Sequence, residues 1–297
     1  MGSKVSSLAA EHGFEAYNTH NARKAPLPRM FRLDIGDRDA TLRLVLEIRP
    51  KTIVNTAALH NVDYCETHRE EADRINVGGA RNLADAAREN GSRLIHLSTD
   101  YVFDGKRGHY NELDPPHPLH YYAKTKFDSE NIVSKLPNYA IARPSVIYGW
   151  NTLEATGIPS SSGKTINFAM FVLDKLKKKE TVKAVRDQYS SPTFADNLAE
   201  ALLLLAKRSE NGVFHTAGRS CMSRYEFATK LAEIFDYSTK LVQPVFTSEL
   251  KQLAERPKTS CLQVGKAEKT LGMKFLTAEE GIKEMKAQEQ SQRVPLT

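Results

Sequence analysis

Two residues near the middle of the chain have the types and the spacing needed to reduce a carbonyl group. Tyr122 and Lys126 are four residues apart, so on a helix they would share one face. A cation beside a phenol favours the phenolate and lowers its pKa from about 10 towards neutral pH. A phenol tuned in this way can give a proton to a carbonyl oxygen while a hydride arrives at the carbon. Taken alone, the pair also fits an amphipathic helix with a solvated lysine.

A hydroxyl group upstream strengthens the catalytic interpretation. Residues 94–97 (LIHL) form an apolar run typical of a buried parallel strand, and Ser98 and Thr99 follow it. Open α/β sheets place their ligands at the carboxyl ends of their strands. The polar segment that comes next contains prolines, which block a helix until just before Tyr122. We therefore expect Thr99, Tyr122 and Lys126 to meet at one edge of a sheet.

Strand and helix patterns alternate along the first half of the chain. Apolar strand patterns fall at residues 14–19, 52–56 and 93–97, and residues 33–35 end another short strand. Helical patterns fall at residues 3–12, 39–49 and 70–90, the last ended by a glycine. This alternation predicts an α/β fold with a Rossmann-like, doubly wound parallel sheet.

The segment 98–105 (STDYVFDG), together with Tyr122 and Lys126, resembles the extended short-chain dehydrogenase/reductase superfamily. Within that superfamily it resembles the dTDP-4-dehydrorhamnose reductase family. Further matches run along nearly the whole chain, at 55–58 (NTAA), 62–66 (VDYCE), 75–77 (INV), 187–193 (DQYSSPT), 215–218 (HTAG), 223–226 (SRYE) and 256–257 (RP). The resemblance implies an NAD(P)-binding domain over residues 1–150. It also implies a mostly substrate-binding C-terminal lobe over residues 151–297, with some segments returning to the main sheet.

The resemblance implies roles for individual residues. Thr99 would hydrogen-bond the substrate carbonyl oxygen and Tyr122 would protonate it. Lys126 would hold the nicotinamide ribose and lower the pKa of Tyr122, so both residues would also touch the cofactor. The other cofactor-binding positions would be Gly2 near the pyrophosphate, Asp34 and Ile35 beside the adenine, Ala57, Ala58 and Leu59 along the path to the nicotinamide ribose, and Leu97.

The start of the chain departs from the family pattern. In a Rossmann fingerprint, glycines between a strand and a helix let the backbone approach a pyrophosphate. Gly2 corresponds to the last of these glycines, so we expect the first strand and two glycines to precede Met1. NAD-preferring folds carry an acid after the second strand, but this chain has Arg23 and Lys24 there, which could meet a 2′-phosphate. The sequence therefore favours NADP as the cofactor, with NAD as the alternative.

The composition narrows the class of protein. The chain of 297 residues is 40% hydrophobic and 26% charged, which is typical of globular proteins. Its net charge of +6 is spread out, which suits an anionic small molecule such as a nucleotide and does not indicate a nucleic-acid partner. No apolar run approaches the roughly 20 residues that span a bilayer, so we expect no membrane partner. The three cysteines lack metal-site spacing, and we expect reduced thiols, a cytoplasmic location and no metal.

We expect NADPH-dependent reduction of a nucleotide-linked 4-keto-6-deoxysugar, and two alternatives stay open. One is a non-catalytic regulatory subunit, because the beta subunit of methionine adenosyltransferase resembles this family over its whole length. The other is a nucleotide-sugar epimerase or dehydratase of the same superfamily. Dehydratases place a carboxylate next to the catalytic hydroxyl, as Asp100 stands next to Thr99. The sugar is left open, since Val146 stands where bacterial rhamnose-pathway members tend to carry a tryptophan. A homodimer is an expectation at the level of the family.

Overall fold

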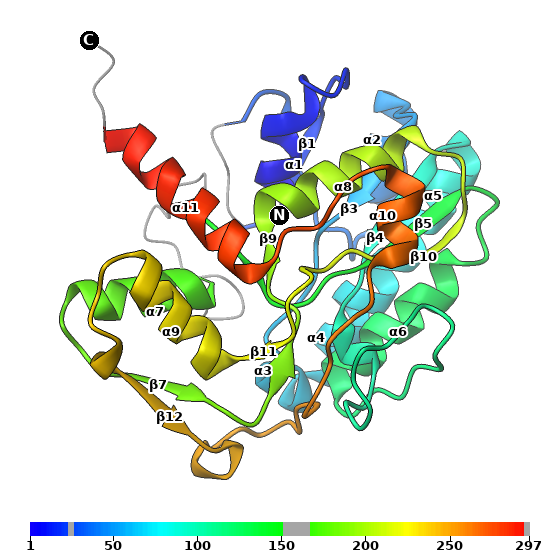
Figure 1. Ribbon diagram of the computed structural model, residues 1–297. Helices are drawn as coiled ribbons and strands as arrows, with labels where there is room; N and C mark the ends of the chain where they lie inside the picture. Colours follow the sequence, from blue (N-terminus) through cyan, green and yellow to red (C-terminus); the bar gives the residue numbers. More distant parts are fainter. Residues whose placement is uncertain (23–26, 151–166, 294–297) are drawn as a thin grey trace.

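The computed structural model describes residues 1–22, 27–150 and 167–293. Its main sheet contains four parallel strands in the order β10-β5-β4-β3 (Figure 1). These strands are β3 (Thr52–Asn55), β4 (Arg93–Leu97), β5 (Tyr139–Arg143) and β10 (Gly212–His215). In the register of the sheet, His96 of β4 lies between Asn55 of β3 and Ile141 of β5. The predicted α/β fold with a parallel sheet is confirmed.

Helices cover both faces of this sheet. Neighbouring residues of a strand point to opposite sides, so an apolar strand has apolar side chains on both faces for helices to pack against. The helices concerned are α1 (Gly2–Ala9), α5 (Gly79–Asn90), α6 (Tyr121–Val133) and α8 (Ala195–Lys207). Ile95 and Ala140 pack in one core with residues of α1 and α8. Leu94 and Ile141 pack in another core with residues of α5 and α6. The sheet is therefore doubly wound, as the sequence predicts.

The N-terminal strands form a separate two-stranded parallel sheet. β1 (Asn18–His20) pairs with β2 (Met30–Arg32). The predicted strand bounds at 14–19 are therefore wrong, since β1 begins later, and so is the predicted strand end at 33–35, since β2 ends at Arg32. α2 (Arg38–Ile48) follows and packs on α5.

The segment predicted as one helix over residues 70–90 contains an irregularity. α3 (Val62–Thr67) and α4 (Arg69–Ala72) lead into a π-helical turn at Asp73–Gly78, and α5 continues from it. Such turns interrupt the regular α-helical hydrogen-bond ladder and are frequent at functional sites. The predicted end at Gly91 is confirmed, and this glycine has the positive φ of 73° that a left-handed cap requires.

A second apolar core lies away from the main sheet. The elements around it are α7 (Phe168–Lys177), α9 (Arg224–Ile234), α11 (Ala278–Arg293) and the parallel strands β7 (Val182–Val185) and β12 (Val242–Val245).

Two short strand pairs complete the described sheets: β6 (Ile147–Tyr148) with β9 (Thr193–Phe194), and β8 (Tyr189–Ser190) with β11 (Met222–Ser223). Short 3-10 turns lie at Asp100–Val102, Thr239–Leu241 and Thr247–Glu249. β10 is a strand of the main sheet, and α8 and α10 (Gly265–Leu271) pack on that sheet. A domain boundary at residue 150 stays a prediction.

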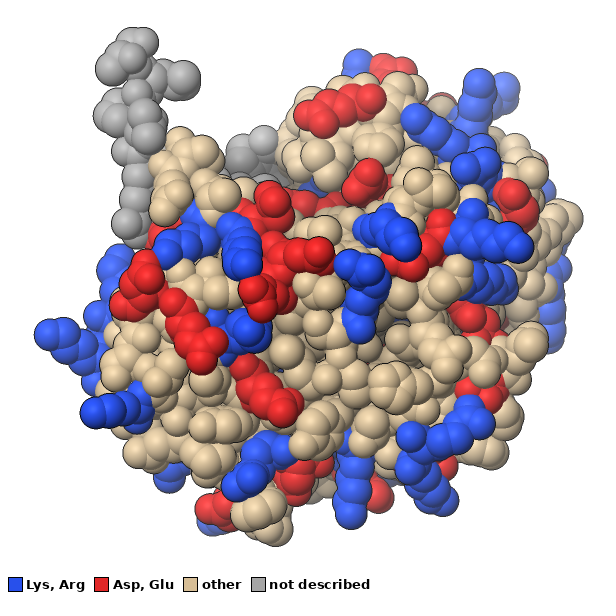
Figure 2. All heavy atoms as spheres, viewed as in Figure 1, with Lys and Arg blue, Asp and Glu red and all other residues tan. Residues whose placement is uncertain are grey.

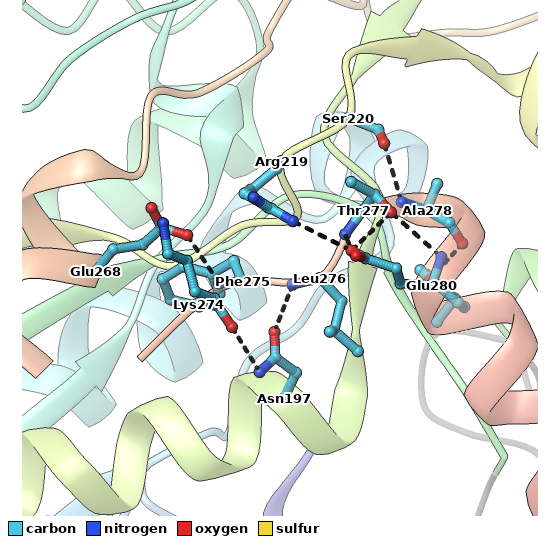
Figure 3. A network of polar contacts seen from close by, with 11 residues as sticks. Asn197, Arg219, Ser220, Glu268, Lys274, Phe275, Leu276, Thr277, Ala278 and Glu280 are labelled. Carbon is cyan, nitrogen blue, oxygen red and sulfur yellow. Dashed lines mark hydrogen bonds and ion pairs between the residues drawn. The ribbon is translucent and has the colours of Figure 1, made fainter. Parts of the chain in front are cut away.

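Hydrogen bonds and an ion pair join the segment between α10 and α11 to α8 and to the β10–β11 connection (Figure 3). Asn197 of α8 accepts the Leu276 N–H at 3.0 Å through its side-chain oxygen. Thr277 and Glu280 cap α11: the Glu280 carboxylate accepts the Thr277 N–H at 2.7 Å, and Thr277 Oγ1 accepts the Glu280 N–H at 3.2 Å. Arg219 pairs with the same carboxylate at 3.3 Å. The two reciprocal hydrogen bonds form a capping box at the start of α11.

The prediction that all thiols are reduced is wrong for two cysteines. Cys221 and Cys261 form a disulfide with their Cα atoms 5.5 Å apart, although 40 residues separate them in sequence. Cys65 is free and buried. Sequence spacing could not reveal the pair, because it depends on the segment before α10 running beside β8, where Thr259 bridges to Tyr189. The expected cytoplasmic location loses the support of reduced thiols.

Charged side chains of both signs are interspersed over one face of the molecule (Figure 2). Several ion pairs of the described residues have helix spacing, including Lys283 with Glu279 at 2.7 Å. Across the ranges that the structure describes, no helix combines the length and the apolar character needed to cross a membrane.

Candidate active site

Thr99 and Tyr122 meet at the carboxyl end of β4. Thr99 caps the 3-10 turn Asp100–Val102, and its Oγ1 accepts the Tyr101 backbone N–H at 3.2 Å. Tyr122 is the second residue of α6, whose first turn is capped by the His120 imidazole. Both hydroxyl side chains are buried, and the Thr99 hydroxyl lies close enough to the phenol to oppose the rise in its pKa. The structure therefore brings together the two groups that the sequence predicts to meet.

The pKa of Tyr122 is raised, which contradicts the expectation that Lys126 lowers it. Burial is the main cause, and the charge of Asp100 adds to it by disfavouring a second anion nearby. Lys126 Nζ is turned instead towards His96 Nε2, 3.1 Å away. Helical spacing places Lys126 and Tyr122 on one face but does not fix where a long lysine side chain ends. In this structure the phenol is protonated at neutral pH.

Asp100 is directed towards protein hydroxyl groups. Its Oδ1 accepts from Thr99 Oγ1 at 3.1 Å. Its Oδ2 accepts from Ser145 Oγ at 2.7 Å and from Ser260 Oγ at 2.5 Å. Burial raises the pKa of this carboxyl, and the three hydroxyl groups oppose that effect. Asp100 thus connects the end of β4 to Ser145, two residues after β5, and to Ser260 in the segment before α10.

Asn76, in the π-helical turn, fixes the segment after β3 against α6. Its side-chain oxygen accepts the Leu59 N–H at 2.8 Å, and its amide nitrogen donates to the Leu59 carbonyl oxygen at 3.1 Å. The same nitrogen donates to Thr125 Oγ1 at 2.9 Å, and Thr125 donates to the Tyr122 carbonyl oxygen at 2.8 Å. The backbone that precedes α3 is therefore held in register with the helix that carries Tyr122.

A buried ion pair lies on the same helix, one turn beyond Lys126. Arg143 of β5 donates to both oxygens of Glu130, at 2.9 Å and 2.5 Å. Ser98 Oγ donates to the same carboxylate. Both side chains of the pair are only 4% exposed. This pair joins α6 to β5 and to the residue before Thr99, so it fixes the helix relative to the sheet edge.

Several positions predicted to bind the cofactor lie along the same edge. Gly2 opens α1, and a Cβ added there would lie 3.1 Å from Thr56 Oγ1, just beyond β3. Ala57 and Ala58 follow in the chain, and Leu97 ends β4. A helix start without a side chain can be approached closely by a pyrophosphate, whose charge the helix dipole favours. The residues present at this edge therefore fit a dinucleotide.

Three other predicted positions are engaged with the protein or buried in it. Asp34 pairs with Arg74 at 2.8 Å; burial would raise the pKa of this carboxyl, but its hydrogen bonds lower it overall. Ile35 and Leu59 are buried. The two predicted cations lie outside the described residues, namely Arg23 and Lys24.

Sequence reasoning missed the groups that support the site. Asn76 lies within the family match at 75–77, which does not indicate its role, and Glu130 lies four residues after Lys126 on the same helix. His96 was read as part of an apolar strand, and it is buried at 1% exposure. A polar residue inside an apolar strand is the signal that could have found His96. A charged residue one turn beyond Lys126 on the same helix face is the signal that could have found Glu130.

The comparisons with known proteins agree with this geometry. The family profile described as RmlD substrate binding domain matches residues 1–291. The chain is 31% identical over 268 residues to the dTDP-4-dehydrorhamnose reductase of Aggregatibacter actinomycetemcomitans, covering 86% of this chain and 87% of that protein. It is 32% identical over 254 residues to methionine adenosyltransferase 2 subunit beta of Rattus norvegicus, covering 83% and 72%. The solved dTDP-4-dehydrorhamnose reductase of Bacillus anthracis, in complex with NADP, has a TM-score of 0.79 at 31% identity, over 87% of this chain and 90% of that one.

The parallel sheet and these matches together define an NAD(P)-dependent oxidoreductase of the extended short-chain dehydrogenase/reductase class. Within that class, the family profile that matches residues 1–291 and the 31% identity to a reductase over 86% of this chain show the family. The chain belongs to the dTDP-4-dehydrorhamnose reductase family, as the resemblance indicated.

Proposed function

We propose that this chain uses NADPH to reduce the keto group of a nucleotide-linked 4-keto-6-deoxysugar. The observation that carries the proposal is the meeting of the buried Thr99 hydroxyl and the buried Tyr122 phenol at the carboxyl end of β4, where the hydroxyl opposes the rise in the pKa of the phenol. Membership of the dTDP-4-dehydrorhamnose reductase family supports it, as does the likeness to the Bacillus anthracis reductase solved with NADP. NAD is the alternative cofactor.

The cofactor, when bound, would supply the hydride. Tyr122 would give a proton to the carbonyl oxygen, since the raised pKa keeps its phenol protonated in the free site. Thr99 would turn its proton from Asp100 Oδ1 to the same oxygen, where charge develops in the transition state and a hydrogen-bond donor lowers the barrier. Lys126 would bind the nicotinamide ribose, and its charge would then stabilise the phenolate that remains on Tyr122. Gly2, Ala57, Ala58 and Leu97 would line the path of the dinucleotide.

The test compares NADPH oxidation by the wild-type chain and by Tyr122→Phe with a dTDP-linked 4-keto-6-deoxysugar. Loss of the proton donor should lower kcat by roughly 10²–10⁴-fold while NADPH still binds. Tyr121→Phe is the matched control, because the Tyr121 phenol donates to Asp73 at 2.6 Å and does not meet Thr99. This control should keep the wild-type rate. A near-normal rate for Tyr122→Phe would remove the phenol from the mechanism.

A second candidate function is that of a non-catalytic regulatory subunit. The likeness to methionine adenosyltransferase 2 subunit beta favours it, and so does the orientation of Lys126 away from the phenol. Recovery of a methionine adenosyltransferase at equal stoichiometry with the tagged chain, together with no NADPH oxidation in a keto-sugar screen, would support this function over the first.

A nucleotide sugar is the expected small-molecule partner under the first proposal. A cytoplasmic location, a homodimer and the lack of a nucleic-acid partner stay predictions. The Cys221–Cys261 disulfide is the observation that speaks against a reducing compartment.

A further inference from the structure

Lys126 has an unusual environment for a cationic side chain. Its Nζ makes one hydrogen bond within the described residues, at 3.1 Å to His96 Nε2, and takes part in no ion pair there. Both side chains are 1% exposed, so bulk water does not reach the amine. A buried ammonium needs acceptors for its three protons, and leaving them unmet is costly. The protonation of His96 therefore decides which form of Lys126 this site accommodates.

The tautomer of His96 follows from Asn55. The Ala57 backbone N–H can only donate, and it donates to Asn55 Oδ1 at 3.1 Å. The amide nitrogen of Asn55 accordingly faces His96 Nδ1, 3.1 Å away. An amide NH₂ group is a donor, so Nδ1 must be the acceptor. The proton of the neutral imidazole then lies on Nε2, the atom that faces Lys126.

The Nε2–H group of His96 has two neighbours. Ser129 Oγ lies 3.0 Å away, and it uses its own proton on the Lys126 carbonyl oxygen at 2.6 Å. The other neighbour is Lys126 Nζ. An ammonium at that place would set N–H against N–H, whereas a neutral amine can accept the imidazole proton through its lone pair.

We propose that His96 is a positioning residue that holds Lys126 as a neutral amine in the cofactor-free site. The charged groups around the pair agree with this assignment. Burial lowers the pKa of Lys126 to about 8, and only the Glu130 charge is found to oppose it among the described groups. Arg143, on β5, binds both oxygens of Glu130 and so weakens its effect on the amine. The neighbouring phenol on the helix face, Tyr122, is uncharged because its pKa is raised.

The consequence for cofactor binding rests on the proposed function. Ribose hydroxyls beside Nζ would supply the acceptors that an ammonium lacks here, so Lys126 would take up one proton from solvent as the cofactor binds. His96 would keep its single proton and turn it to Ser129 Oγ. Lysine would thus become the cation that stabilises the phenolate only when the cofactor is in place.

The test follows Lys126 in the cofactor-free chain by NMR with ¹³C at lysine Cε. The Lys126→Met variant identifies the signal, and exposed lysines serve as internal controls with midpoints near about 10.4. Burial alone would lower the pKa of Lys126 to about 8. Because the Nε2–H group of His96 disfavours the ammonium further, we expect the Lys126 midpoint below neutral pH in the wild type. In His96→Gln the side-chain oxygen can turn to accept from the ammonium, and the midpoint should rise by about one pH unit or more.

A second measurement needs no variant. The ¹⁵N signals of His96 in the wild type should report a bare Nδ1 and a protonated Nε2. A Lys126 midpoint at or above neutral pH, a midpoint unmoved in His96→Gln, or a protonated Nδ1 would each overturn the proposal. Absence of NADPH binding would refute the proposed function but leave these midpoints unchanged, so the two failures are distinguishable.

Discussion

Replacing Arg143 by methionine would leave the Glu130 carboxylate buried without its counter-charge. Glu130 accepts two hydrogen bonds from Arg143 and one from Ser98, and the pair is only 4% exposed. Methionine fills much of the space of the arginine stem but offers no donor. Since water cannot replace the lost guanidinium in so enclosed a place, the carboxylate would carry its desolvation cost almost alone.

The size of the loss follows from this enclosure. Removing one partner of a buried, hydrogen-bonded ion pair costs about 3–5 kcal/mol, whereas replacing both partners is often close to neutral. Arg143→Met should therefore lower the free energy of unfolding by about 3–5 kcal/mol. Glu130→Gln combined with Arg143→Met removes the charge and keeps an acceptor for Ser98, so it should recover most of that loss.

Urea unfolding of the single and double variants measures both values. Lys178→Met is the matched control, because Lys178 pairs with Asp174 at 2.8 Å at the surface, with the two side chains 57% and 49% exposed. Such exposed pairs contribute less than about 1 kcal/mol. A single variant as stable as the control, or a double variant no more stable than the single one, would refute the reasoning.

Two further predictions concern the phenol and the packing of α11. Asp100→Asn removes the charge that helps to raise the pKa of Tyr122, so the high-pH midpoint of kcat/KM should move to lower pH; a midpoint that stays or rises would show that Tyr122 is not the titrating group. Gly281→Ala should lower the unfolding midpoint in urea although alanine favours helices, because the added Cβ would lie 2.1 Å from the Tyr148 hydroxyl oxygen. Gly265→Ala is its control, since no atom lies within 4 Å of a Cβ placed there.

The main sheet could be predicted because its strands are short apolar runs separated by helical patterns. β4 carries the clearest run, and its predicted bounds at 93–97 agree with the structure. β1 and β2 have three residues each, too few to show a period, and their predicted bounds were wrong. The π-helical turn at Asp73–Gly78 could not be predicted either, since its residues continue an ordinary helical pattern.

The meeting of Thr99 and Tyr122 could be predicted because each stands at the end of an element whose direction the fold fixes. The contacts that hold them could not be, because they join residues that are far apart in sequence. Asn76 and Thr125 are 49 residues apart, and Asp100 and Ser260 are 160 apart. The orientation of Lys126 was missed for a different reason. It depends on the proton of His96, which a spacing rule does not contain.

The orientation of Asp100 bears on which reaction the site supports. A dehydratase would need this carboxylate free to act on the carbon beside the carbonyl group. Here Oδ1 accepts a hydrogen bond from the Thr99 hydroxyl, and Oδ2 accepts hydrogen bonds from the Ser145 and Ser260 hydroxyls. Turning the carboxylate towards a substrate would break contacts with two other segments of the chain, and the disulfide at Cys261 holds the residue next to Ser260. Asp100 is therefore placed to orient the Thr99 hydroxyl beside Tyr122, an arrangement suited to protonating a carbonyl oxygen.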